Sequence, residues 1–150
     1  MTGYQNPTLA EKSLSYKPHY KTSERPVITS SQDSYKILIF CWDEGRLGFL
    51  EEFKILLLNR ANRVIGVHAL SLGGRCSTIA DPKVIFSVAL KAAASQIILA
   101  HNHLLSNLKA SDPDLKLTKK MQLAGSLLDL LVIDHLILTK DGIQVLLMRD

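Results

Sequence analysis

The stretch Gln96–His103 (QIILAHNH) decides the fold of this 150-residue chain. Its apolar part, Gln96–Ala100, predicts a short buried strand that ends where the polar residues begin. Apolar residues at helical spacing then predict a helix over about Pro113–Leu128, and the β-rich run Leu131–Thr139 predicts a second strand. A strand, a helix and a strand in this order favour a mixed sheet with helices packed on it.

Other segments complete this predicted sheet. Apolar runs bounded by turn residues predict further strands, and capping residues followed by helical spacing predict two further helices. The elements expected are a helix from a Ser30 or Ser31 cap to about Trp42, strands over Phe53–Asn59 and Arg63–Leu72, a helix from an Asp81 cap to about Ala94, and a strand over Ile143–Met148 after a turn with Gly142. The predicted fold class is α/β (α+β), a mixed β-sheet with about three flanking helices and five to six strands.

Length and composition describe one globular domain. Residues 1–25 are polar and show no sustained period, so we expect a flexible N-terminal segment followed by a domain over 26–150. The net charge of +4 permits a nucleic-acid partner but is too small to indicate one. Since no run approaches the roughly 20 apolar residues of a membrane span and the N-terminus has no apolar signal core, we expect a cytoplasmic protein.

The polar residues after the Gln96–Ala100 strand suit a metal ion. His101 and His103 are two positions apart, and side chains at this spacing on a strand point to the same face. Asp114 follows in the predicted first helical turn and can add a carboxylate oxygen. Two imidazole nitrogens and one oxygen leave a fourth tetrahedral position for water, as in catalytic zinc sites.

The same residues also have structural interpretations. Ser111 followed by Asp114 is a capping box, and Asp112 before Pro113 is a good helix cap. A metal-activated water also needs a general base, and Glu51 and Glu52 stand at the mouth of a predicted strand. Composition and spacing do not choose between these two carboxylates, and either can be a solvated residue.

The spacing matches a known family. His101-x-His103, seven residues, Ser111, two residues and Asp114 reproduce the H-x-H-x7-S-x2-D pattern of the JAMM (MPN+) metalloproteases. The chain resembles the bacterial RadC-like branch of that family over about residues 26–142. The other matching segments are Phe53–Gly66, Gly73-Gly74, Asp81-Pro82-Lys83 with the helix that follows, and Asp134-His135.

This resemblance implies a JAB/MPN-like fold and a role for each matching residue. His101, His103 and Asp114 become ligands of Zn²⁺, and Glu51, rather than Glu52, becomes the catalytic general base. Ser111 becomes a donor to the oxyanion. The implied reaction is hydrolysis of a peptide or isopeptide bond in an unidentified protein substrate, with a DNA-repair-associated role through the family.

The sequence also departs from the family pattern. Leu104, Leu105 and Ser106 stand where the family usually has Pro-Ser-Gly, and Ala110 replaces a usual proline. Loss of proline and glycine loosens the loop, which favours a second interpretation, an interaction module with little or no catalysis. Many family members carry a helix-hairpin-helix DNA-binding region before this domain. None is found in this sequence, so direct DNA contact is not implied.

Overall fold

A five-stranded mixed sheet forms the centre of the computed structural model, which describes residues 24–72, 80–104 and 108–147. The strands are β1 (Glu52–Leu58), β2 (Val64–Leu72), β3 (Gln96–Asn102), β4 (Leu131–Thr139) and β5 (Gly142–Val145). Their order across the sheet is β2-β1-β3-β4-β5. Only β3 and β4 pair in parallel, and the other neighbours are antiparallel. The predicted mixed sheet and fold class are confirmed.

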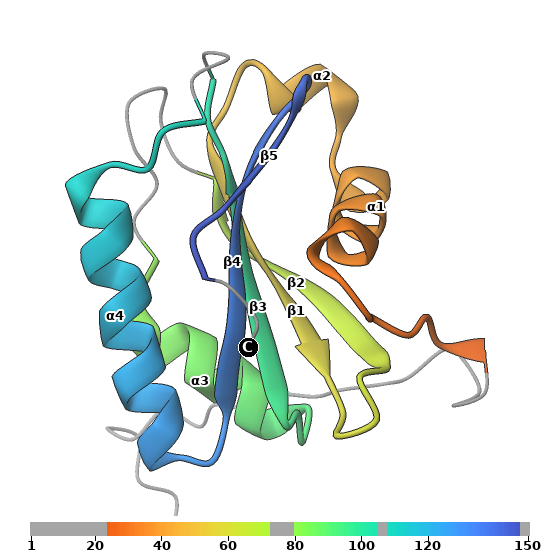
Figure 1. Cartoon of the computed structure of the whole chain (residues 1–150), viewed down its shortest axis with the longest axis vertical. Coiled ribbons are helices and arrows are strands. Elements are labelled where there is room, and N and C mark those ends of the chain that lie inside the picture. The colour runs from red at the N-terminus through yellow and green to blue at the C-terminus, as the bar shows by residue number, and fades with distance from the viewer. Residues whose placement is uncertain (1–23, 73–79, 105–107, 148–150) are drawn as a thin grey trace, which may run out of the picture.

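Helices cover both faces of this sheet (Figure 1). On one face lie α3 (Pro82–Lys91) and α4 (Asp112–Leu127), and on the other lies α1 (Ser31–Cys41). Alternate side chains of β1 divide between the two cores: Phe53, Ile55 and Leu57 face α3 and α4, whereas Leu56 and Leu58 face α1. Because both faces are covered, the whole of β1 is buried, as its continuous apolar sequence predicts.

The helix starts follow their capping residues. The Ser30 side chain accepts a hydrogen bond from the Asp33 N–H at the start of α1, and Asp81 accepts one from the Lys83 N–H at the start of α3. Ser111 caps α4, which settles the choice between Ser111 and Asp112 as the cap. These local bonds satisfy amide groups that a helix leaves unpaired at its first turn.

The structure differs from the sequence prediction at several points. The strand predicted over Gln96–Ala100 continues to Asn102, because its pairing with β1 continues to His101 and its pairing with β4 to Asn102. A short helix, α2 (Glu44–Leu47), was missed because four residues are too few to show a period. The last strand was predicted too long: its pairing ends at Val145, although the apolar sequence continues through Leu147. The predicted segment 1–25 lies almost wholly outside the described residues, as do Gly73 and Gly74.

Gly125 lies where α4 packs against the chain entering β4. A Cβ added at Gly125 would overlap the Leu130 carbonyl oxygen and press on Val132. We expect Gly125→Ala to lower the free energy of unfolding by about 1–3 kcal/mol through overpacking, despite the better helix propensity of alanine. Gly48→Ala is the control, since nothing lies within 4 Å of a Cβ there. Urea denaturation of both variants measures the difference, and equal midpoints would contradict the expectation.

Candidate metal centre

The end of β3 and the first turn of α4 bring three metal-ligating side chains together. His101 Nε2 lies 3.2 Å from Asp114 Oδ1 and 3.2 Å from His103 Nε2. His103 Nε2 lies 3.4 Å from Asp114 Oδ2. One ligand atom from each of these residues lies within 4.8 Å of the others. The structure thus brings together the three residues that the sequence predicts, in an arrangement that can hold a metal ion.

Pairing on both sides of β3 fixes the two histidines. His101 is opposite Phe53 of β1 in the sheet register, and their rings stack with centroids 5.7 Å apart. His103 lies just beyond the strand, where its N–H donates to the Leu138 carbonyl at 3.0 Å. Both imidazoles therefore face α4, as the two-residue spacing predicts.

The capping box of α4 places Asp114. The Ser111 N–H donates to Asp114 Oδ2 at 2.9 Å, and the Asp114 N–H donates to Ser111 Oγ at 3.2 Å. Partial burial alone would raise the pKa of Asp114, but hydrogen bonds with His101 and His103 and the Ser111 N–H hold it well below its usual range. Asp114 therefore takes part in the capping box of α4 and also stands among the candidate metal ligands. Its carboxylate is held in the ionised form.

A chain of hydrogen bonds holds the His101 ring at Nδ1, on the side away from His103 and Asp114. Thr118 Oγ1 donates to the Asp114 carbonyl at 2.8 Å and lies 2.6 Å from His135 Nδ1. Because the hydroxyl has a single hydrogen, His135 Nδ1 must be the donor to Thr118. His135 Nε2, 2.9 Å from His101 Nδ1, then accepts from His101. In the neutral form that binds a metal ion, the Nε2 lone pair of His101 then faces His103 and Asp114, as a metal ligand requires.

His135 is neutral in this arrangement. Burial lowers the pKa of His135 to about 3, and the neighbouring His101 adds to the effect. Asp134, the preceding residue, points to the other face, where Ser31 Oγ donates to its carboxylate at 2.7 Å. The supporting role of His135 was missed from the sequence, where a satisfied core histidine was the simple interpretation. The Asp134-His135 pair was the sequence pattern that could have indicated this role of His135. No sequence pattern indicated a role for Thr118.

The Glu52 side chain faces the α1 side of the sheet. It is 2% exposed and lies 3.2 Å from Arg46 Nε and 3.5 Å from Lys54 Nζ. Glu51 directly precedes β1, and alternation continued by one residue would put it on the face of Phe53 and His101. Glu52 is thus directed away from the metal ligands. The catalytic role of Glu51 stays a prediction.

Ser111 and the altered loop complete the predicted set. The Ser111 hydroxyl accepts from the Asp114 N–H, and its own hydrogen is left to donate, so capping does not prevent the predicted oxyanion contact. Leu104 is half-buried. Leu105 and Ser106 lie outside the described residues, so the predicted effect of this loop on turnover is untested.

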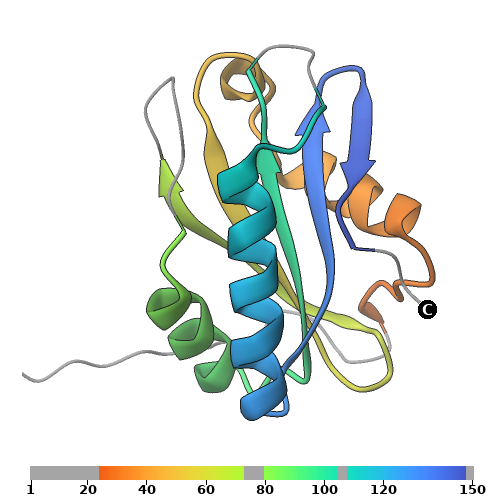
Figure 2. The same ribbon diagram turned by 60° about the vertical axis from the view of Figure 1, so that its left-hand side comes forward.

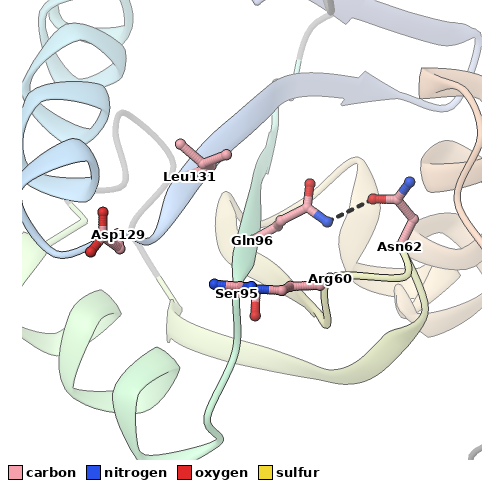
Figure 3. Close-up of a pocket in the computed structure, with 6 residues that line it drawn as sticks. All are labelled: Arg60, Asn62, Ser95, Gln96, Asp129 and Leu131. Atoms are coloured by element: carbon pink, nitrogen blue, oxygen red, sulfur yellow. Dashed lines mark hydrogen bonds between the residues drawn. The ribbon is translucent and has the colours of Figure 1, made fainter.

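A pocket of about 630 Å³ lies at the opposite end of the sheet (Figure 3). Its lining includes Ser95 and Gln96, where β3 begins, whereas the ligands lie where β3 ends. Gln96 Nε2 donates to Asn62 Oδ1 at 2.6 Å across it. Asp129 is the one carboxylate among its lining residues, so this pocket offers no comparable set of metal ligands. The chemistry therefore indicates the His101 cluster as the functional site.

The fold and this cluster define an α+β protein with a metal-site arrangement of the JAMM type. The sequence matches the model of the RadC-like JAB domain over residues 28–149. The chain belongs to the RadC-like JAB domain family. None of the helices within the described residues is long and apolar enough to cross a membrane.

Curated relatives support this membership. The chain is 41% identical over 115 residues to a UPF0758 protein of Flavobacterium johnsoniae, covering 75% of this chain and 48% of the relative. It is 37% identical over 126 residues to a UPF0758 protein of Porphyromonas gingivalis, covering 83% and 54%. A third, from Alkaliphilus metalliredigens, is 40% identical over 111 residues, covering 74% and 47%. The chain spans about half the length of these relatives, and their names state no activity.

The low pKa of His135 predicts how stability depends on pH. Between pH 6.5 and about 3 the unfolded chain binds a proton at His135 that the folded chain does not. Stability of the metal-free protein should therefore be full above pH 6.5 and fall, by up to about 1.4 kcal/mol per pH unit, as pH drops below it. Urea unfolding with chelator between pH 7 and 5, above the range of most carboxylates, measures this slope.

The matched variants are His135→Gln, which should flatten this slope, and His68→Gln, which should keep it because His68 is exposed on β2. An unchanged slope in His135→Gln would show that another group causes the acid sensitivity.

Proposed function

We propose that this chain is a zinc-dependent hydrolase that cleaves a peptide or isopeptide bond. The observation that carries the proposal is the convergence of His101, His103 and Asp114, with the Nε2 lone pair of His101 directed to the cluster by His135. Family membership supports the JAMM type of chemistry. The relatives' names supply no substrate, so the bond class comes from the family resemblance.

The donor set fits zinc. Two neutral imidazole nitrogens and one carboxylate oxygen are typical zinc ligands, and three protein ligands leave a position for water. A zinc ion held there would lower the pKa of a bound water to about 7 and polarise a substrate carbonyl. The backbone bonds of His103 and the capping box of Asp114 prearrange these ligands, which limits the reorganisation needed on binding.

The chain's own residues supply the remaining roles in this proposal. Glu51, directly before β1, takes the proton from the attacking water and delivers it to the leaving amine. The Ser111 hydroxyl, close to Asp114, donates to the oxygen that becomes negative as the carbonyl turns tetrahedral.

Metal analysis tests the ligand assignment. Protein purified without chelator should contain about one zinc per chain, and His103→Ala should lose most of it, since two remaining ligands bind far more weakly. His68→Ala, which changes an exposed histidine of β2, should keep the wild-type metal content. If the wild-type protein contains no zinc even after attempted reloading, the proposed function is wrong.

Turnover tests Glu51 separately from metal binding. A library of peptides and lysine-linked isopeptides should yield a cleaved member, and Glu51→Gln should lower its cleavage by at least about 100-fold while zinc content stays the same. Glu44→Gln, at an exposed residue of α2, should cleave normally. Zinc binding by the wild type with no cleavage of any library member would instead favour the interaction module.

A further inference from the structure

Asn102 is the residue between the two metal-ligating histidines, and it points the other way. It is the last residue of β3, its exposed fraction is 0%, and its side chain lies against the segment that joins α2 to β1. An amide this deeply buried is costly unless its donors and its acceptor all find partners. Neither the ligand set nor the proposed catalytic residues account for it.

The Asn102 amide makes three hydrogen bonds to the chain between the end of α2 and the start of β1. Asn102 Oδ1 accepts from the Glu52 N–H at 2.6 Å. Asn102 Nδ2 donates to the Leu50 carbonyl at 2.9 Å and to the Leu47 carbonyl at 2.7 Å. The Leu50 carbonyl belongs to the peptide group before Glu51, and the Glu52 N–H belongs to the peptide group after it. One side chain therefore holds both peptide groups that flank Glu51.

We propose that Asn102 is a positioning residue that fixes the backbone at Glu51 relative to the metal ligands. This inference rests on the proposed function, because it gives Asn102 a purpose only if Glu51 serves that site. The link is short: Asn102 is covalently bonded to His101 and His103, and hydrogen-bonded to both sides of Glu51. Any shift of the backbone at Glu51 relative to the two histidines would break these bonds.

The chemistry of the amide explains why asparagine is suited to this position. Aspartate has nearly the same shape, but it has no donor and would place a carboxylate against the carbonyls of Leu47 and Leu50. Other contacts hold the remainder of the segment: Lys54 Nζ donates to the Cys41 carbonyl at 3.1 Å and pairs with Glu52. Asn102→Asp would keep the bond from the Glu52 N–H and lose the two donors, whereas Asn102→Ala loses all three bonds and should release the backbone around Glu51 with the rest of the fold in place.

Hydrogen exchange of the metal-free protein tests the clamp itself. Asn102→Ala removes the oxygen that accepts from the Glu52 N–H and should raise the exchange rate of this amide by about ten-fold or more, with α4 and β4 unchanged. Asn102→Asp keeps an oxygen for this N–H and removes only the donors to Leu47 and Leu50, so it should raise the rate less, and it serves where Asn102→Ala does not fold. Asn62→Asp is the control for Asn102→Asp at the other end of the sheet, where the oxygen that accepts from Gln96 is kept. Unchanged exchange at Glu52 in the folded variant would overturn the proposal.

The absorption of protein loaded with Co²⁺ tests the consequence for Glu51. Its pH midpoint in the visible region should shift in Glu51→Gln, and Asn102→Ala, which adds no charge beside the ligands, should shift it in the same direction. The double variant should show little further change, because both substitutions remove the same contact of Glu51 with the metal-bound water. A merely structural asparagine would leave the midpoint of Asn102→Ala at the wild-type value, which overturns the proposal.

Failure of the proposed function is distinguishable from failure of this inference. If neither Glu51→Gln nor Asn102→Ala shifts the midpoint, Glu51 does not serve the metal site and the positioning role falls with it. If wild-type protein binds no Co²⁺ or zinc, the hydrolase proposal and the role toward Glu51 chemistry both fall. Faster exchange at Glu52 would then identify Asn102 as a structural clamp only.

Discussion

Alternation of side chains along the end of β3 is the constraint on which the rest of this structure depends. His101 and His103 face α4, while Asn102 between them faces α2. The register cannot slip by one residue, because Ile97 and Leu99 fill one core while Ile98 and Ala100 fill the other. Burial of both faces of β3 therefore fixes the direction of three adjacent polar side chains. His101 and His103 point to the face of the candidate ligand cluster, and Asn102 points to the opposite face.

The polar residues inside the sheet carry a cost that packing alone would avoid. His101, Asn102, Asp134 and His135 are at most 5% exposed, on two adjacent central strands where apolar side chains would pack without desolvation. Each has a hydrogen-bond partner: an imidazole, backbone groups, or a hydroxyl. Such a fully paired polar network in a sheet interior is typical of a site retained for its chemistry rather than its stability.

Much of the fold could be predicted from the sequence because its signals are local. Ser30, Asp81 and Ser111 mark helix starts through side-chain bonds to the next few amides, and the apolar runs of β1, β3 and β4 are long enough to recognise. The ends of β3 and β5 could not be predicted, since they depend on how far neighbouring strands continue to pair.

The residues of the candidate site likewise divide into those that a local sequence pattern predicts and those that it does not. The spacing of His101, His103 and Asp114 is a local pattern, and the structure confirms that these residues meet. Thr118, His135 and Asn102 could not be assigned their roles, because each acts through a partner far away in the sequence or through the backbone. Spacing left Glu51 and Glu52 equivalent; the family resemblance selected Glu51, and the structure adds that Glu52 lies on the side of α1, away from the candidate ligands.

The strand–helix–strand unit formed by β3, α4 and β4 determines which part of the chain supplies each part of the candidate site. This unit contains the three candidate metal ligands and the two residues that support His101 through hydrogen bonds, Thr118 and His135. Figure 2 shows how its strands and helix lie side by side. Glu51 instead arrives from a distant part of the chain through the antiparallel pairing of β1 with β3. The three candidate ligands and the residues that support them thus come from one continuous stretch of the chain, whereas the proposed base has to be brought to them by a separate strand pairing.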